Sequence, residues 1–464
     1  MNKLKSKKGI TLVAIVITIV VLLILAGASI NLILGDNGII AKAQEAQRKS
    51  AEATQNDLIG MNELAQQLEE QINGSAGSGS GNGGAGGSGA GTKVPAEATA
   101  ETAPYFPDNT FTKKEGTIDT GLVIQDASGN EYVWVVVPKS LYNNTAYNSN
   151  NAKKPSSSTD YANIEYCLQQ YTATYRNGTS YSDVYYPDDK NVGWFADETA
   201  YNNLKNSMLK SVYENGGFYV GRYEAGIGTN RTSKSATNSD GKYTIEGMPA
   251  PVSKADAYPY TYVTRTQAQN LASNVNSGTK TSSLMFGVQW DLVLAFMSKD
   301  TAKITSTDVL TKNSTTIGNY SDNLWTIKNA NAKYSTDYGS TFTACPNPFK
   351  KESSSSKLLT TGADSSFSVQ NIYDIAGNVW EWTLEWTSDT SYPCAFRGGD
   401  CYSTGSSRPA AFRNDDNTDS SSYKHRFPCF TFLGWRRDMK LEKSYKWKIV
   451  EKYNKNIIKK HLLW

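Results

Sequence analysis

The chain has 464 residues, of which 39% are hydrophobic, and its 47 Lys and Arg residues against 44 Asp and Glu residues give a formal net charge of +3. So small a net charge argues against binding to nucleic acid, for which a strongly basic surface is typical. The composition changes along the chain, so we expect several segments of different kinds.

The first 34 residues predict a membrane anchor. Residues 1–9 form a basic leader with four lysines, and residues 10–34 are almost entirely apolar. As a helix rising about 1.5 Å per residue, the apolar run would be about 37 Å long, enough to cross a bilayer. The lysines before it place the N-terminus in the cytoplasm and the remainder outside, on a bacterial cell surface.

A cleaved secretory signal is the alternative interpretation of this segment. Ala26-Gly27-Ala28 could be the cleavage site, because small residues precede signal-peptidase cuts. The apolar run nevertheless continues to Leu34, beyond the usual length of a signal. This length favours a spanning helix.

The leader also has the order of residues seen in type IV prepilins. Lysines and Gly9 precede an apolar run that starts at Ile10, and this arrangement resembles the prepilin leader. The resemblance implies a prepilin peptidase that cuts after Gly9, methylation of Ile10 and assembly with pilin-like subunits into an extracellular filament. Pilins usually carry a glutamate at the fifth mature position, where this chain has Ala14.

Two segments then separate the apolar run from the rest of the chain. Residues 35–73 predict a helical stalk, because they lack proline and carry an apolar stripe at three- and four-residue steps from Leu58 to Leu68. The stripe needs a cover, which the body of the protein, a second copy or pilin-like subunits could supply. Residues 74–107 predict a flexible linker whose Gly/Ser-rich part would span about 25 Å. The linker implies a tethered head.

Residues 108–436 predict a loop-rich α+β head. Two β-rich runs around a Ser-Gly-Asn turn predict a hairpin over residues 121–138. Helices are expected at 198–213, 265–273 and 288–297, and long surface loops over most of residues 141–215. Residues 437–464 are lysine-rich and favour either an amphipathic helix at an anionic surface or a solvated tail.

One short run near the C-terminus carries a chemical pattern. Gly377 precedes an expected strand and supplies a tight turn between two acidic residues. The carboxylates of Asp374 and Glu381, with the carbonyls of Gly377 and Val379, could offer a hard cation such as Ca²⁺ several oxygens. Alternatively, Asp374 caps the turn and Glu381 pairs with a nearby arginine.

The same run carries a family resemblance. Residues 373–382, followed by Arg397-Gly-Gly399 and Gly434-Trp-Arg436, resemble the C-terminal half of the formylglycine-generating enzyme (sulfatase-modifying factor) family. Weaker matches precede it in the same order, at residues 217–225, 251–252 and 287–290. The resemblance implies a compact fold related to C-type lectins and a structural calcium ion at the positions matching Asp374, Gly377, Val379 and Glu381.

The resemblance does not extend to the family's chemistry. Active members use a pair of copper-binding cysteines, and Ser403 and Arg408 stand at the corresponding positions here. Cys401 lies nearby, but a single thiolate is a poor copper site. The iron-dependent branch of the superfamily needs a histidine cluster, whereas this chain has only two histidines. We therefore expect no enzyme of these types.

A ligand-binding surface is the remaining expectation for the head. The chain has 28 tyrosines against 14 phenylalanines, and Tyr with Asn provides rigid contact surfaces with hydrogen-bonding tips. Secreted polar loops show the same composition without any ligand. The region between the two framework motifs faces outward in the lectin-like relatives. Its candidate ligand-binding residues are Tyr402, Ser403, Arg408, Asn414, Asp415, Asn417 and Tyr423.

The five cysteines leave their pairing open. An odd number outside the cell leaves at least one thiol unpaired, and connectivity does not follow from sequence. A bridge between Cys401 and Cys429 and a set of buried thiols are both consistent with the spacing.

Three functions follow from these patterns. The first is a membrane-anchored or pilin-like surface protein that displays a non-catalytic, lectin-like domain toward a protein or glycan. The second, an alternative, is an oxidase of the formylglycine-generating type, which would require a thiol pair that the sequence does not show at the expected place. The third is a structural component of a pilus or envelope whose loops contact only like subunits.

Overall fold

The computed structural model describes residues 97–176, 181–233, 237–275, 280–421, 425–426 and 431–435. The chain divides into two units, and all described residues belong to the second, Gly87–Trp464. The expected leader with Gly9 and Ile10, the apolar segment, the stalk, most of the linker, Tyr423 and the basic tail lie outside the described residues. None of the helices in the described ranges is both long and apolar enough to cross a membrane.

The structure corrects the expected fold class. We expected an α+β protein with a long apolar N-terminal helix and a lectin-like head. The described residues instead combine a few helices with six small sheets, most of whose pairings are antiparallel. Short strands explain the difference: several have only two residues, and turns with positive φ interrupt the chain at nine non-glycine positions in the described part. These interruptions prevent the strands from merging into one large sheet.

The largest sheet joins distant parts of the sequence. Its six strands follow the order β1-β2-β3-β4-β19-β7. They are β1 (Thr112–Glu115), β2 (Val123–Gln125), β3 (Glu131–Val136), β4 (Gly217–Gly221), β7 (Lys280–Ser283) and β19 (Thr431–Trp435). The antiparallel pairing of β2 with β3 confirms the hairpin expected over residues 121–138. At β4, Gly217 is needed because a Cβ atom there would meet the carbonyl oxygen of Val135 at 2.4 Å.

A second sheet, in the order β17-β16-β15-β18, carries most of the polar groups discussed below. Its strands are β15 (Trp380–Trp386), β16 (Cys394–Arg397), β17 (Arg413–Asp416) and β18 (His425–Arg426). Only the pairing of β15 with β18 is parallel in this sheet. The loop from Thr387 to Pro393 joins β15 to β16, and β17 forms one edge.

The remaining strands form small sheets around these two. A three-stranded sheet contains β9 (Lys333–Ser335), β10 (Thr343–Ala344) and β12 (Leu358–Leu359). Two-stranded pairs are β5 (Gly226–Ile227) with β6 (Tyr258–Pro259), β8 (Trp325–Ile327) with β11 (Phe349–Lys351), and β13 (Ser368–Val369) with β14 (Ile372–Tyr373).

Five α-helices lie within the described ranges: α3 (Ser158–Tyr171), α4 (Glu198–Asn215), α5 (Arg265–Asn274), α6 (Gly287–Met297) and α7 (Asp308–Thr311). Short 3₁₀ helices occur at Lys139–Asn143, Ala173–Tyr175, Thr315–Ile317 and Ser365–Phe367. Helices α4, α5 and α6 match the expected ones, whereas α3 lies where we expected loops. Sequence signals explain the bounds of α4, which Asp197 caps and which ends at Gly216 with φ of 69°.

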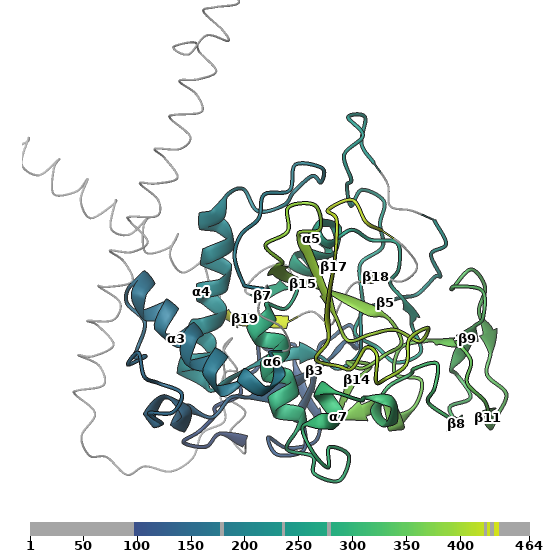
Figure 1. Cartoon of the computed structure of the whole chain (residues 1–464), viewed down its shortest axis with the longest axis horizontal. Coiled ribbons are helices and arrows are strands. Elements are labelled where there is room, and N and C mark those ends of the chain that lie inside the picture. Colours follow the sequence, from purple (N-terminus) through teal and green to yellow (C-terminus); the bar gives the residue numbers. More distant parts are fainter. Residues whose placement is uncertain are drawn as a thin grey trace, which may run out of the picture. The chain divides into compact units, whose positions relative to one another are not determined.

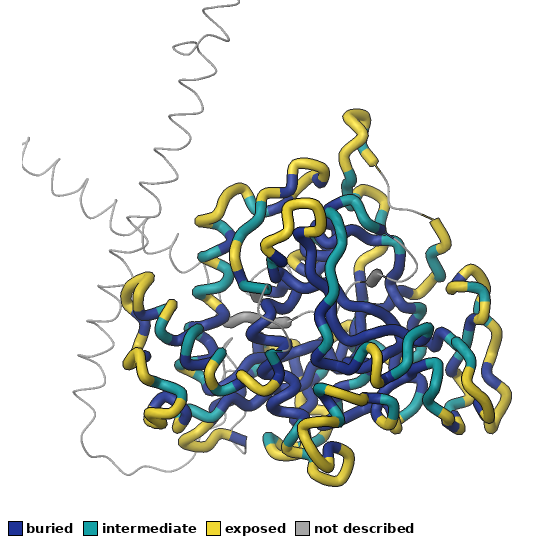
Figure 2. The backbone as a smooth tube through the Cα atoms, in the orientation of Figure 1, coloured by how far each residue is buried: buried dark blue, intermediate teal, exposed yellow. Residues whose placement is uncertain are grey.

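Helix α6 passes through the interior of the head (Figure 1). Every one of its residues is buried, so it lacks the polar face that a surface helix would have. It packs in one large core with side chains of β3, β4, α4 and β15, among which Trp134, Trp290 and Trp382 are fully buried. Figure 2 shows this buried centre, with the exposed residues concentrated in the surrounding loops. The core thus supplies a rigid base for the loops.

Candidate functional site

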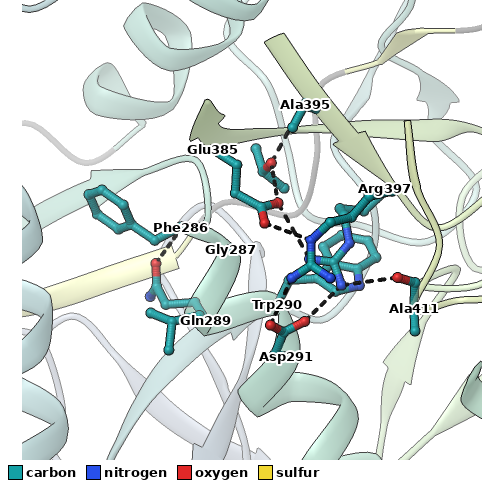
Figure 3. Close-up of polar contacts among 12 residues, drawn as sticks. Phe286, Gly287, Gln289, Trp290, Asp291, Glu385, Ala395, Arg397 and Ala411 are labelled. Atoms are coloured by element: carbon teal, nitrogen blue, oxygen red, sulfur yellow. Dashed lines mark hydrogen bonds and ion pairs between the residues drawn. The ribbon is translucent and has the colours of Figure 1, made fainter. Parts of the chain in front are cut away.

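A buried network of four charged residues connects α6 with three strands of the second sheet. Arg397 Nη2 donates to Asp291 Oδ1 at 2.8 Å, and its Nη1 lies 3.4 Å from Glu385 Oε2 (Figure 3). Arg413 donates through Nη2 to Asp291 Oδ2 and through Nε to Glu385 Oε1, both at 2.8 Å. All four side chains are buried, and their formal charges cancel.

The ion pairs keep Glu385 and Arg413 ionised. Burial alone would raise the pKa of Glu385, but Arg413 and Arg397 outweigh it and lower this pKa to about 2. Burial disfavours the charge of Arg413, yet Glu385 and Asp291 raise its pKa above the usual value. The network is closed to solvent, so it acts as a support that ties α6, β15, β16 and β17 together.

A third carboxylate, that of Asp183, fixes the segment at one side of the pocket described next. Asp183 accepts hydrogen bonds from the backbone N–H groups of Gly287 at 2.6 Å and Val288 at 3.0 Å, at the first turn of α6. The neighbouring Ser182 exchanges two backbone hydrogen bonds with Trp386, at 2.8 and 2.9 Å. The segment at residues 181–183 is thereby attached to both α6 and β15.

An open pocket of about 530 Å³ lies between this segment, the β15–β16 loop and β17. Its lining residues are Tyr181, Thr387, Ser388, Asp389, Thr390 and Asp415. Tyr181 Oη donates to Asp415 Oδ2 at 2.9 Å, and burial together with this bond raises the pKa of Tyr181. Tyr181 therefore remains a neutral donor at physiological pH.

The loop that forms one wall of the pocket is held by its own hydrogen bonds. Thr387 Oγ1 donates to the carbonyl of Tyr392 at 2.6 Å, and the N–H of Ser391 donates to Asp389 Oδ1 at 2.7 Å. Beside it, the Tyr186 ring stacks on Trp386 with centroids 6.1 Å apart. The pocket thus has ordered walls.

The pocket presents mainly hydrogen-bond acceptors to solvent. One oxygen of each carboxylate, Oδ2 of Asp389 and Oδ1 of Asp415, makes no hydrogen bond to any other described residue. Neither a lysine nor an arginine lines the pocket. Chemically, this arrangement suits a polar ligand that carries hydroxyl or N–H donors.

The predicted metal ligands lie on one turn and the strand that follows. Asp374 Oδ2 accepts the N–H of Gly362 at 2.7 Å, and the N–H of Gly377 donates to the carbonyl of Gly398 at 2.7 Å. Val379 and Glu381 are buried. No cluster of three or more His, Cys, Asp or Glu residues suited to a metal was found in the described ranges. The Asp374 carboxylate thus already has a protein partner, and the calcium ion stays a prediction.

The predicted ligand-binding residues fall on two segments. Tyr402, Ser403 and Arg408 follow β16 in a turn-rich segment, where the N–H of Ser403 donates to Asp400 Oδ1 at 2.9 Å. Asn414 and Asp415 lie on β17, and Asn417 follows it. Of the candidates that the structure describes, only Asp415 lines the pocket.

Sequence reasoning did not select the other residues of the pocket. Tyr181 stands in a tyrosine-rich stretch, and residues 387–390 read Thr-Ser-Asp-Thr between two strands. A polar run of this kind signals a loop but gives no reason to join it to residues more than two hundred positions earlier. The run lies between the strand that ends at Trp386 and the strand that begins at Cys394. This position could have identified residues 387–390 as a loop at the surface.

The four cysteines within the described ranges are buried. Burial raises the pKa of Cys167 and Cys345 to about 11 and that of Cys394 to about 12, so these thiols stay protonated. Cys401 is also buried, and Cys429 lies outside the described residues. The structure therefore does not decide between a bridge joining the last two and buried thiols, the two alternatives left open by the sequence.

Comparison with known proteins identifies no family. The chain matches no family model and no curated protein. Among solved structures, Treponema denticola variable protein 1 is similar over 66% of this chain and 85% of that chain, with 15% identity and a TM-score of 0.21. A TM-score of this size does not establish a shared fold, so the resemblance noted from sequence stays a prediction.

Proposed function

We propose that this chain is a bacterial surface protein, anchored through its apolar N-terminal segment, whose head recognises a protein or glycan without catalysis. The observation that supports recognition is the pocket at Tyr181 and Asp415. Arg413 ties β17, the strand that carries Asp415, to the buried charge network, and the carboxylates of Asp389 and Asp415 offer acceptors in the pocket. Preorganised polar groups on a rigid base are typical of binding sites.

The linker supports the same proposal. Residues 74–91 are almost exclusively Gly, Ser and Ala, and such a segment separates a folded domain from its attachment point. A head held away from the membrane in this way can meet partners on other surfaces.

An adhesion experiment tests the proposal. Cells displaying the full-length chain, or its Asp415→Asn variant, are mixed with epithelial cells or with other bacteria. We expect the variant to reduce attachment about ten-fold, because it weakens a charge-assisted hydrogen bond in the pocket. Asp308→Asn is the control, since Asp308 lies on the exposed face of α7 and does not line the pocket. Attachment that is equal for all three chains would contradict the proposal.

A further inference from the structure

Several hydrogen-bond donors of the pocket already have acceptors within the protein. The hydroxyl of Tyr181 donates to Asp415 Oδ2 at 2.9 Å, and that of Thr387 donates to the carbonyl of Tyr392 at 2.6 Å. The N–H of Asp389 donates to Thr387 Oγ1 at 3.2 Å. What these lining residues still offer to a ligand is therefore their acceptor oxygens.

The two carboxylates of the pocket have no cationic partner in the described part of the chain. Asp389 accepts hydrogen bonds from the N–H groups of Ser391 and Tyr392, and Asp415 accepts one from Tyr181. All of these donors are uncharged. The hydrogen bonds therefore hold the carboxylates in place but leave both negative charges in the pocket.

Three cations on neighbouring segments are paired elsewhere. Arg413 is bound to both carboxylates of the buried network. Lys190 pairs with Asp419 at 3.3 Å, and Lys205 pairs with Glu165 at 2.9 Å. These three side chains therefore do not neutralise the pocket carboxylates.

A ligand that only donates hydrogen bonds matches such a pocket. Arginine and lysine side chains carry several N–H donors and no acceptor. A sugar hydroxyl also has an acceptor oxygen, which would exchange the donors that water supplies for a wall of acceptors. An anion would be repelled by both carboxylates. The volume of about 530 Å³ lies within the range of about 300–1,000 Å³ that is usual for ligand sites.

The segments that form the pocket also carry exposed apolar side chains. Tyr392, on the β15–β16 loop, is 49% exposed, and Val184, which follows the segment at residues 181–183, is 42% exposed. Tyr186 is half-buried, and its hydroxyl donates to the carbonyl of Thr390 at 3.3 Å. Protein interfaces are enriched in aromatic residues, and apolar contacts around a polar centre keep water away from it. These surroundings favour a protein as the partner.

We propose that the pocket receives an arginine or lysine side chain of a protein partner. The inference rests on the proposed function, because it concerns the same pocket, and it deepens that function by choosing a protein over a glycan. The cation would lie between Asp415 on β17 and Asp389 on the β15–β16 loop. Because both carboxylates are open to solvent, binding is expected to weaken as the salt concentration rises.

Saturation-transfer NMR on the purified full-length protein tests the inference. The probes are N-acetylarginine amide, the uncharged N-acetylcitrulline amide of nearly the same shape, and methyl mannoside. We expect the arginine probe to bind about ten-fold more tightly than the citrulline probe, and the sugar not to bind. Binding of the arginine probe should weaken about ten-fold in Asp415→Asn, which is half-buried, and about three-fold in Asp389→Asn, which is exposed.

Asp308→Asn is the matched control, because it removes an exposed carboxylate that does not line the pocket and should leave the binding of the arginine probe unchanged. Equal losses in Asp308→Asn and Asp415→Asn would overturn the inference. Equal binding of the arginine and citrulline probes, no binding of the arginine probe, or binding of the sugar alone would do so as well. If cell attachment still depends on Asp415 in those cases, the proposed function stands with an uncharged partner; if it does not, both proposals fail.

Discussion

Asp291, Glu385, Arg397 and Arg413 show how single residues fix the geometry of the head. Each carboxylate contacts both guanidinium groups, so removing any one of the four leaves an uncompensated charge in the interior. Such a loss costs far more than the loss of an exposed pair, where water replaces the partner. The contribution of the charge network to the free energy of unfolding can therefore be measured by substituting single residues.

The substitution Asp291→Asn tests this support. We expect it to lower the free energy of unfolding by about 3–5 kcal/mol, because two buried guanidinium groups then share one carboxylate. Urea denaturation of the full-length protein gives the value. Asp308→Asn is the matched control: Asp308 pairs with Lys312 at 3.1 Å, but the side chains are 57% and 72% exposed. Its expected loss is under about 0.5 kcal/mol, and equal losses would refute the buried support.

The low pKa of Glu385 predicts a particular pH dependence. A carboxylate whose folded pKa is about 2, against 4.5 when unfolded, contributes stability above pH 4.5 and loses that contribution as the pH falls through about 2. The difference in unfolding free energy between the wild type and Glu385→Gln should therefore be constant above pH 5 and shrink from pH 4.5 to 2. Thermal unfolding measured across this range checks it. A difference independent of pH would show that Glu385 is not ionised in the folded head.

At the scale of secondary-structure elements, the start of α6 is packed directly against the charge network. A Cβ atom at Gly287 would meet Glu385 Oε1 at 2.2 Å, and two arginines prevent this carboxylate from moving away. Asp183 also receives the first N–H groups of the helix. Helix, strand and pocket segment thus meet at one glycine.

Gly287→Ala is expected to destabilise the head by about 1–3 kcal/mol, the usual cost of overpacking in a rigid interior. Gly228→Ala provides the comparison, because no atom lies within 4 Å of the Cβ position there. Its effect should stay within about 0.5 kcal/mol. Differential scanning calorimetry of both variants measures these losses of stability. Equal stability of Gly287→Ala and the wild type would contradict the close packing, because it would mean that Glu385 can move away.

The turn and strand from Asp374 to Glu381 carry the prediction of calcium. If the ion binds there, it stabilises the folded head by mass action, by about 2.7 kcal/mol at a hundred times the dissociation constant. We therefore expect the melting temperature to fall in EDTA and to recover with CaCl₂ but not with MgCl₂. The same melting temperature in all three solutions would contradict the prediction of a calcium site at this turn.

Elements with local signals could be predicted from the sequence. The hairpin of β2 and β3 follows from β-rich runs around a turn, and α4 follows from its cap and its terminal glycine. Helix α3 was missed because it is rich in Tyr and Gln and buries only a narrow face, at Asp160, Ile164, Cys167 and Leu168. The two-residue strands were not predictable either, since only their distant partners define them.

The contacts of the candidate site were even less predictable from the sequence than the short strands. The Arg-Gly-Gly motif pointed to Arg397, but nothing in its sequence surroundings identifies Asp291, 106 positions away, as the partner. Likewise, Tyr181 and Asp415 are 234 positions apart. Contacts of this separation arise from packing around α6, which the sequence pattern does not encode locally.

At the scale of the whole molecule, the proposed anchor and the proposed recognition head have separate roles and can be tested separately. The apolar run at residues 10–34 concerns attachment, and the pocket concerns a partner. Attachment by a retained membrane segment and release into a filament after processing lead to different mature chains. The N-terminus of the mature protein distinguishes them.

Mass spectrometry of sheared surface material and of the membrane fraction measures that terminus. If the leader is processed as in prepilins, the sheared chain begins at Ile10, and it is shorter than the initial chain by residues 1–9. If the chain is a single-span membrane protein, the leader is intact and the protein stays with the membranes. A terminus near Ala28 in soluble material would contradict both outcomes, because it indicates a secretory signal.

The position of β19 has a consequence for biogenesis. This strand, residues 431–435, inserts between β4 and β7 in the largest sheet, so both neighbours have open edges until β19 has been synthesised. The sheet closes only after residues 431–435 are available to pair. Until then, strands formed from residues 217–221 and 280–283 need protection from aggregation. If the chain is exported as proposed, we expect its folding to depend on a chaperone at the outer face of the membrane, and truncation before residue 431 to yield insoluble chains.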